Sequence, residues 1–232
     1  MKTKRENKKS DKALLQEIEQ YWNEHIHDLE IAENPVGSQG FFQDLENYRF
    51  EKLHYLPNLV DFNAWSGKKV LEVGCGVGID LVRFARGGAR VTGIDLADKS
   101  IELAKKNFEF HSLSARLQKG NGEQLDFPDN AFDCVYAHGV IQYTANDQAL
   151  IDEIYRVLKP GASAIMMVYN RHSWLNFLSR TLKVKMEHTD APVLKQYSRR
   201  EFSSLLKTFS KVNLVTERFP VRSRLQKGLK AV

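Results

Sequence analysis

Alternating glycines mark the first place in the chain where residue types and spacing could do chemistry. Gly74, Gly76 and Gly78 directly follow a short apolar run. A dinucleotide fingerprint, G-x-G-x-x-G, would need its third glycine at position 79, where this chain has Ile79. A nucleoside triphosphate P-loop is also excluded, because no lysine and hydroxyl pair follows the glycines. The spacing therefore predicts a turn whose backbone closely approaches a ligand without cradling a pyrophosphate.

Polar side chains follow the next two apolar runs. Asp95 comes 21 residues after Gly74 and could accept hydrogen bonds from both hydroxyls of a ribose. The sequence Gly120-Asn121-Gly122-Glu123 follows the third run, and its amide and backbone groups could bind the edge of an adenine. Each residue alone is more typical of a helix cap, but their order and spacing together favour a nucleoside site.

An open, mostly parallel sheet would bring these residues together. Apolar runs predict strands at residues 69–73, 90–95, 115–118, 132–137, 163–169 and 211–217, with a turn at Pro160-Gly161. Helical periodicity predicts helices at residues 79–86, 99–110, 147–158, 171–186 and 198–208. Because strands and helices alternate, we expect an α/β fold with helices on both faces of the sheet and residues 69–73 at its centre. Ligands would bind at the carboxyl ends of the strands.

The residues before this region form a different kind of segment. Residues 1–11 are charged and have little to bury, so we expect a disordered basic tail. Residues 12–65 are predicted to be helical, with an amphipathic helix at 12–27 and a second helix at 39–56 that Pro57 ends. Residues 66–232 would form one α/β domain. The end at Val232 lacks a clear closing strand, which favours a truncation at the C-terminus.

Composition sets further limits on the class of protein. Hydrophobic residues make up 42% and charged residues 27% of the 232 positions, which suits one globular domain. The net charge of +5 resides in residues 1–12 and 195–232, which we interpret as solubilising flanks around an acidic centre. The pattern contains neither a membrane span nor a secretory signal, so we expect a cytoplasmic protein. Cys75 and Cys134 are the only cysteines and have no ligand partners nearby, so we expect no disulfide and no metal site.

Five segments of the chain resemble class I S-adenosylmethionine-dependent methyltransferases, and most of all the branch of the ubiquinone and menaquinone biosynthesis C-methylases. They are residues 70–78, 91–95, 120–127, 132–140 and 154–161. The resemblance implies a Rossmann-like, mostly parallel seven-stranded sheet flanked by helices, with residues 12–65 as an N-terminal helical lid. It also implies an enzyme that transfers a methyl group from S-adenosylmethionine to an acceptor.

The same resemblance implies roles for individual residues. Those implied to bind the methionine part of the cofactor are Glu72, Gly74, Cys75, Gly76 and Gly78. Asp95 would bind the ribose, and the adenine would contact Leu96, Asn121, Gly122 and Glu123, with Asn121 in place of the family's usual aspartate. His138, at the end of the fourth strand, would contact the methionine part or the acceptor. Either Arg49 or Arg83 could pair with the cofactor carboxylate.

The acceptor side of the predicted site is less specific. If the acceptor must lose a proton, the candidate catalytic bases are His138, Tyr143, Tyr21 and His25, each of which could instead be a pocket wall or a packed helix face. Aromatic residues predict a pocket for a small, aromatic or apolar acceptor, with walls at Tyr21, Trp22, Phe41, Phe42, His138, Tyr143 and residues 169–174. We do not expect a nucleic acid.

Three alternatives remain open at this point. The chain could be a cofactor-binding subunit without its own catalysis, or an RNA methyltransferase, and either would use the basic C-terminal segment for docking. The third is a Rossmann-type dehydrogenase, which the missing third glycine disfavours. Binding of S-adenosylmethionine without binding of NAD would exclude the dehydrogenase.

Overall fold

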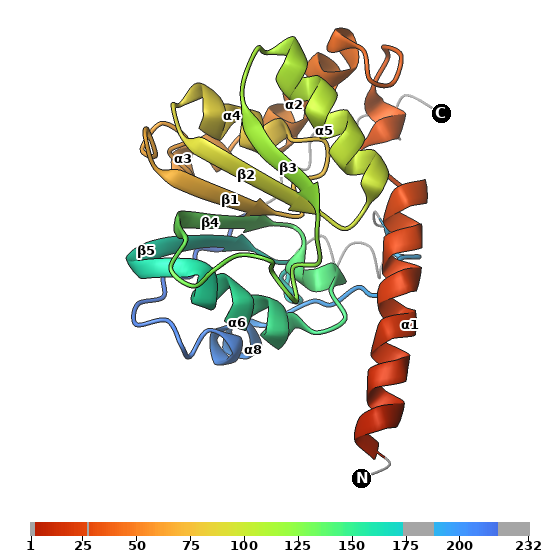
Figure 1. The fold of residues 1–232 in the computed structure, drawn as a ribbon, viewed down its shortest axis with the longest axis vertical. Helices are drawn as coiled ribbons and strands as arrows, with labels where there is room; N and C mark the ends of the chain where they lie inside the picture. The colour runs from red at the N-terminus through yellow and green to blue at the C-terminus, as the bar shows by residue number, and fades with distance from the viewer. Residues whose placement is uncertain (1–2, 27, 174–187, 218–232) are drawn as a thin grey trace.

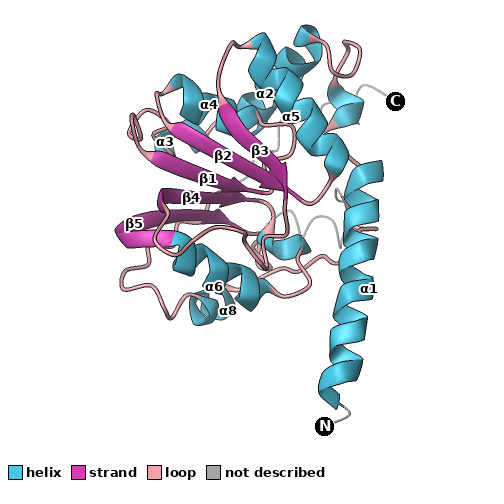
Figure 2. Ribbon diagram, viewed as in Figure 1, coloured by secondary structure: helices cyan, strands magenta, loops and turns pink. Residues whose placement is uncertain are grey.

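The computed structural model describes residues 3–26, 28–173 and 188–217 and contains a parallel sheet between two layers of helices (Figures 1 and 2). Its strands are β1 (Lys69–Val73), β2 (Arg90–Asp95), β3 (Ala115–Lys119), β4 (Phe132–His138) and β5 (Leu158–Met167). They lie in the order β3-β2-β1-β4-β5, and every neighbouring pair is parallel. The central position of β1 confirms the expectation from the sequence.

The helices connect and flank these strands. They are α1 (Thr3–Glu24), α2 (Gln39–Lys52), α3 (Leu56–Leu59), α4 (Ile79–Arg86), α5 (Asp98–Phe110), α6 (Asp147–Val157) and α8 (Arg199–Leu205), with two 3-10 turns, η1 (Leu29–Ile31) and η2 (Ile141–Tyr143). Ser198 caps α8 in the predicted capping box with Glu201. The predicted helix at 171–186 lies outside the described residues from position 174 onward.

Within the described residues the sheet has five strands, so the prediction of seven was wrong. The run Lys211–Glu217, predicted as a last strand, has no regular secondary structure. Val212 and Val215 are both exposed, and Leu214 is the apolar residue of this run that packs against a hydrophobic cluster, so most of the run is not covered by the core.

Three element boundaries also differ from the predictions. Helix α1 begins at Thr3 rather than Lys12, within the segment expected to be disordered, where no glycine or proline interrupts a helix. The helix predicted at 39–56 is divided into α2 and α3, and Pro57 lies in the first turn of α3, a position where its missing N–H costs nothing. Pro160 and Gly161 lie inside β5 rather than in a turn, because an edge strand beside a register shift tolerates them.

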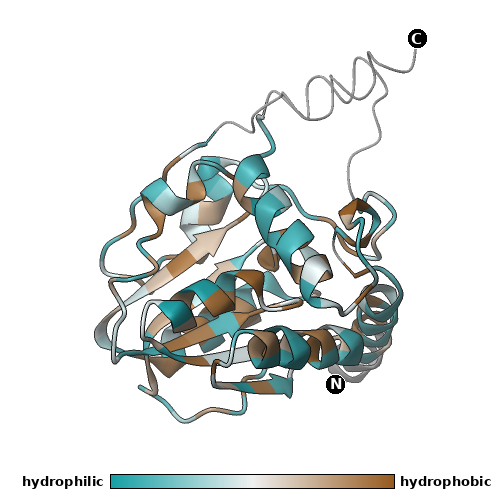
Figure 3. Ribbon diagram, turned by 90° about the horizontal axis from the view of Figure 1, so that it is seen from above, coloured by the Kyte–Doolittle hydropathy of each residue, from teal (hydrophilic) through white to brown (hydrophobic). Residues whose placement is uncertain are grey.

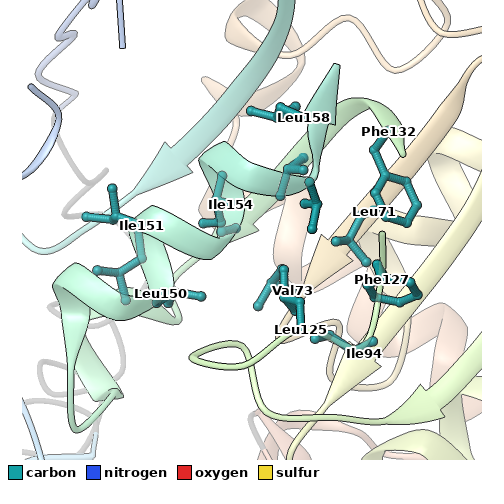
Figure 4. Close-up of a cluster of buried hydrophobic side chains, with 14 of the residues drawn as sticks. Leu71, Val73, Ile94, Leu125, Phe127, Phe132, Leu150, Ile151, Ile154 and Leu158 are labelled. Atoms are coloured by element: carbon teal, nitrogen blue, oxygen red, sulfur yellow. The ribbon is translucent and has the colours of Figure 1, made fainter. Parts of the chain in front are cut away.

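Two hydrophobic clusters fix the layers. On one face of the sheet, α6 and α8 cover a cluster in which Leu150 and Ile154 face Leu71 and Val73 of β1 (Figure 4). On the other face, α3, α4 and α5 cover a cluster centred on Val70, Phe84 and Tyr136. Figure 3 shows the hydrophobic residues gathered on the strands and on the inner sides of the helices. These two clusters hold the strand ends, and therefore the loops that follow them, in fixed relative positions.

Candidate functional site

A cavity of about 230 Å³ lies at the carboxyl ends of the strands, where α1 runs along the edge of the sheet (Figure 1). The loops that follow β1, β2, β3 and β4 form one side of it, and α1 and α2 form the other. The predicted cofactor residues that line it are Glu72, Gly74, Cys75, Gly76, Asp95, Leu96, Asn121, Gly122, Glu123 and His138. The structure thus brings together residues from four separate strand ends, as a parallel sheet requires.

The glycine turn after β1 uses each glycine differently. Gly74 has φ +70°, and a Cβ there would come within 2.7 Å of Val140, so packing excludes a side chain. Gly76 has φ +52°, and a Cβ there would meet nothing within 4 Å, so its surroundings are open. Gly78 does not line the cavity; it is the N-cap of α4 with φ +80°, a conformation that favours glycine. Gly76 is therefore the position where the backbone can approach a ligand.

Asp95 holds this turn from the end of β2. Its Oδ2 accepts a hydrogen bond from the backbone N–H of Gly76 at 2.9 Å, and its Oδ1 accepts one from Ala97 at 2.9 Å. Burial raises the pKa of Asp95 above its ordinary value, although these backbone donors oppose the shift. Each carboxylate oxygen keeps a second lone pair, so Asp95 can accept two further hydrogen bonds from a ligand.

The loop after β3 lines the cavity, but its polar side chains mainly hold the loop itself. Asn121 Oδ1 accepts a hydrogen bond from the backbone N–H of Glu123 at 2.9 Å, so the oxygen expected to face an adenine already has a partner. Gly122 is required by packing, because a Cβ would come within 2.8 Å of both Leu150 and Val73. The backbone of this loop is therefore better placed to bind a ligand than the Asn121 oxygen.

A buried ion pair connects α2 to the glycine turn. Arg49 donates from Nε to Asp80 Oδ1 at 2.5 Å and from Nη2 to Asp80 Oδ2, while the Tyr136 hydroxyl donates to the same Oδ2 at 2.7 Å. Burial raises the pKa of Asp80, but the Arg49 guanidinium outweighs burial and leaves this pKa below its ordinary value. Arg49 Nη2 also lies 3.2 Å from His138 Nδ1.

The two arginines considered from the sequence have different places. Arg49 lines the cavity, whereas Arg83 pairs with Glu46 and lies over the ring of Phe50. Asp80, which also lines the cavity, was missed by the sequence analysis. A signal was present, because Asp80 stands four positions before the buried Phe84 on an amphipathic helix and so lies on its buried face.

Glu72 is the buried acid beneath the glycine turn. The residue is 4% exposed, and its Oε2 accepts no hydrogen bond from the described residues. Burial raises its pKa well above the ordinary value, and the nearby Asp80 carboxylate raises it further. An acceptor atom buried without a donor is costly, so this oxygen fits a ligand group that donates a hydrogen bond.

Helix α1 supplies an apolar wall. One side of this helix lines the cavity with Leu15, Ile18 and Trp22, and Ile26 continues the wall just after the helix ends. These residues are spaced by three and four positions, so they lie on the same side. The Trp22 ring packs edge-on against Tyr143 at a centroid distance of 4.9 Å, and the Tyr143 hydroxyl donates to the Tyr169 hydroxyl at 3.3 Å. Trp174, the last residue of the predicted wall segment, lies outside the described residues.

The four candidate bases divide into two groups. His138 and Tyr143 line the cavity, and burial raises the pKa of Tyr143, with Tyr169 adding to the shift. Tyr21 and His25 do not line it: the Tyr21 hydroxyl donates to Asp190 at 3.2 Å and lies 3.1 Å from His188 Nδ1, and His25 is exposed. Burial raises the pKa of Tyr21 to about 12, with Asp190 adding to the shift. Tyr21 therefore contacts the 188–190 segment rather than the cavity.

Two other predicted wall residues are core residues. Phe41 and Phe42 are fully buried in the contact of α2 with Val77 and Leu103 and do not line the cavity. Their adjacent positions place both rings against α5 and the glycine turn, where their burial stabilises the packing of α2.

Comparison with known proteins shows which proteins this chain resembles. Residues 71–166 match the sequence family described as a methyltransferase domain. That part of the chain is similar to methyltransferase domains. It is 34% identical over 159 residues to a sterol 24-C-methyltransferase of Aspergillus fumigatus, a match that covers 66% of this chain and 38% of that protein. It is 33% identical over 106 residues to a demethylmenaquinone methyltransferase of Tropheryma whipplei, covering 45% and 43% of the two chains.

The chain also matches a solved structure, that of an S-adenosylmethionine-dependent methyltransferase from Aquifex aeolicus. The TM-score is 0.58 at 21% identity, and the match covers 77% of this chain and 91% of that chain. This likeness shows a shared Rossmann-like fold. The chain spans less than half of the length of the two curated relatives it matches.

The similarity to methyltransferases implies S-adenosylmethionine as the cofactor, and three residues of the cavity fit that molecule. The buried Oε2 of Glu72 lacks a donor among the described residues, which suits an ammonium group, and the space beside Gly76 would be filled by any Cβ. Asp95 offers lone pairs to hydroxyls at the next strand end. The predicted cofactor therefore agrees with the chemistry of the residues present.

Two further features were searched in the described part of the chain. No group of three or more His, Cys, Asp or Glu side chains there is arranged to hold a metal ion. No helix there is both long enough and apolar enough to cross a membrane.

Proposed function

We propose that this chain transfers a methyl group from S-adenosylmethionine to a small, apolar or aromatic acceptor. One observation carries the proposal: a single cavity joins the glycine turn and Asp95 to the apolar wall formed by Ile18 and Trp22 of α1. Small-molecule sites are typically apolar cavities with a few converging polar groups, and this cavity has both parts.

Three residues of the cavity would hold the cofactor. Asp95 would accept hydrogen bonds from the ribose, Glu72 would accept one from the ammonium group, and Gly76 would allow close approach of the backbone. When bound, S-adenosylmethionine supplies a methyl group that is already electrophilic. The protein's task is then to bring the acceptor into line and to exclude water.

Helix α1 would perform the second task. Its apolar residues Ile18 and Trp22 lie across the cavity from the strand ends, so α1 acts as part of an N-terminal lid over the acceptor. The contacts of Trp22 with Tyr143 and of Tyr21 with Asp190 hold α1 in this closed position. His138 and Tyr143 are the cavity residues that would orient the acceptor.

The similar proteins support a small acceptor without specifying it. The names of the Aspergillus and Tropheryma relatives refer to a sterol and to a demethylated menaquinone, both small molecules. The apolar wall from α1 suits an acceptor of that general kind, whereas a phosphate-bearing acceptor would favour cationic side chains, and Leu15, Ile18, Trp22 and Ile26 provide none. We propose the class of acceptor only, and placement in the cytoplasm stays a prediction.

Calorimetry and a labelling screen test the proposal. We expect binding of S-adenosylmethionine and of its demethylated product, with no binding of NAD. Radiolabelled cofactor incubated with small-molecule extracts and, separately, with RNA should label a component of the extracts. Labelling of RNA alone, with a salt-dependent affinity, would favour the RNA methyltransferase instead. Binding of cofactor without any labelled product in either mixture would favour a non-catalytic subunit.

A further inference from the structure

The position of Arg49 determines which nitrogen of His138 carries a proton. His138 ends β4 and lines the cavity, and its Nδ1 lies 3.2 Å from Nη2 of Arg49. A guanidinium has five N–H donors and no acceptor. For this contact to be a hydrogen bond, Nδ1 must therefore accept, which leaves the ring proton on Nε2.

We propose that Arg49 is a positioning residue that holds His138 as the neutral imidazole protonated on Nε2, so that His138 donates a hydrogen bond to a bound ligand and does not act as a general base. The inference deepens the proposed function, because it assigns a chemical role to a cavity residue. It needs only the residues of this chain, and so it can be tested without cofactor or acceptor.

The surroundings keep Arg49 charged and in place. Both oxygens of Asp80 accept from Arg49, and the Tyr136 hydroxyl donates to Asp80 as well. The side chain of Asp80 is 1% exposed, so this carboxylate is not free to turn toward another cation. A buried charge pair with satisfied hydrogen bonds is costly to break, which fixes the guanidinium beside His138.

Several charged or titratable groups among the described residues lie near His138. Arg49 contacts it from α2, the Tyr136 ring of β4 stacks on it at a centroid distance of 5.8 Å, and the Asp80 carboxylate of α4 interacts with it electrostatically. The Asp80 charge by itself favours the imidazolium, but both of its oxygens accept hydrogen bonds from Arg49, so Asp80 is the anion that balances the guanidinium. A proton on Nδ1 would remove the acceptor of this contact, and in the imidazolium it would also place a second cation 3.2 Å from the guanidinium.

The consequence concerns the ligand group that meets His138. A ring that carries its proton on Nε2 presents a donor, so it pairs with an oxygen that accepts, such as a carboxylate or a carbonyl. It cannot remove a proton from a hydroxyl or ammonium group of the acceptor. Methyl transfer in this cavity would then use an acceptor atom that needs no proton removal by His138.

Histidine nitrogen NMR tests the inference directly. The protein contains seven histidines, so the His138 signals of uniformly ¹⁵N-labelled protein would be assigned by their loss in His138→Gln. Long-range proton–nitrogen spectra distinguish the two neutral tautomers and the imidazolium. We expect the His138 signals to keep the pattern of the Nε2–H tautomer as the pH falls from about 8 to about 6, the range in which an ordinary imidazole gains its proton.

Arginine variants test whether Arg49 is the cause. In Arg49→Met, the unpaired Asp80 carboxylate should favour the imidazolium, so the His138 signals should shift as the pH falls. Arg49→Lys, which still only donates, should restore the Nε2–H pattern. Arg83→Met is the matched control, because Arg83 pairs with Glu46 outside the cavity, and it should leave the His138 signals unchanged.

Three results would overturn the inference. They are an Nδ1–H or imidazolium pattern for His138 in the wild type at neutral pH, an Arg49→Met spectrum identical to the wild type, and a shift in Arg83→Met as large as in Arg49→Met. The wild-type spectrum decides the protonation state even if Arg49→Met does not fold. Because no cofactor or acceptor is added, a failure of the proposed methyl transfer would leave this result unaffected.

Discussion

The two sides of the cavity are built in different ways. On the strand side, backbone hydrogen bonds fix the site: Gly76 donates to Asp95, and Asp95 accepts from Ala97 two residues along the chain. On the α1 side, side chains from distant segments fix it, as in the contact of Trp22 with Tyr143 and the bond from Tyr21 to Asp190. The strand side is a rigid, locally encoded binding surface, whereas the α1 side depends on packing between elements. Variants on the two sides should therefore affect different steps.

The largest effect is expected at Gly76 on the strand side. Gly76→Val places a branched side chain in the open space beside the turn, at a φ of +52° that such residues rarely adopt. Binding of S-adenosylmethionine should become undetectable by calorimetry, and the free energy of unfolding should fall by about 1–2 kcal/mol from backbone strain.

Gly67→Val is the matched control for Gly76→Val. Gly67 has φ +72° and equally open surroundings, but it lies before β1 and does not line the cavity. It should lose similar stability and keep its affinity for the cofactor. If both variants bind as tightly as the wild type, the assignment of the glycine turn to the cofactor is wrong.

Asp95→Ala should have the next largest effect. It removes a carboxylate that has lone pairs left for ribose hydroxyls, and a hydrogen bond to a charged group contributes about 1.5–3 kcal/mol. The dissociation constant for S-adenosylmethionine should rise by about tenfold to a hundredfold, as measured by calorimetry. Asp98→Ala is the control, because Asp98 is an exposed acid three residues away that pairs with Lys119. An unchanged constant in Asp95→Ala would exclude the ribose assignment.

The same difference between the two sides explains what could be predicted from the sequence. The bounds of β1 and β2, the glycine turn and the position of Asp95 at the end of β2 follow from local patterns, and the structure agrees with them. Local apolar runs and glycine spacing suffice there, because Gly76 and Asp95 each directly follow a strand and the parallel pairing of β1 with β2 brings the two strand ends together. The sequence also showed that β1 is central, since alternating strands and helices restrict the topology.

Long-range contacts were beyond the sequence patterns. Aromatic character alone could not separate Trp22, which lines the cavity, from Phe41, which packs in the core. It also could not show that Tyr21 binds Asp190, a residue 169 positions away. The prediction of seven strands came from the family resemblance rather than from residues 211–217 themselves, whose valines do not alternate.

Trp22→Ala tests the α1 side and should affect the acceptor rather than the cofactor. Aromatic pairs contribute about 0.5–1.5 kcal/mol beyond burial, so KM for the acceptor should rise by about threefold to tenfold. The affinity for S-adenosylmethionine should change by less than about twofold, because Trp22 lies on the α1 side of the cavity and the cofactor residues lie on the strand side. Phe110→Ala, an exposed aromatic outside the cavity, is the control. A Trp22→Ala variant that loses cofactor affinity but keeps the acceptor KM would reverse the assignment of the two sides.

Glu72→Gln should change how stability depends on pH. The pKa of Glu72 is raised in the folded protein, so its contribution to stability is fully present below the ordinary value of 4.5 and declines as the pH rises above it. A glutamine side chain does not titrate, so the stability of Glu72→Gln does not decline in this way. The melting temperature of Glu72→Gln should exceed that of the wild type at pH 7. The increase should be about 2–4 °C for each kcal/mol gained in the free energy of unfolding, and it should vanish near pH 4. Glu102→Gln, on the exposed side of α5, should show no such trend.

Cys75→Ala should have the smallest effect, although Cys75 lines the cavity beside Gly76. Its side chain is buried and lies close to Gly93, and burial raises the pKa of the thiol well above its ordinary value. A protonated thiol is a weak donor and a poor nucleophile, so the residue contributes packing and the backbone N–H that bonds to Ile94. The alanine variant keeps that N–H, and its affinity for S-adenosylmethionine should stay within about twofold of the wild type. A loss as large as that of Asp95→Ala would show that side chains, and not only the backbone, determine binding at the turn.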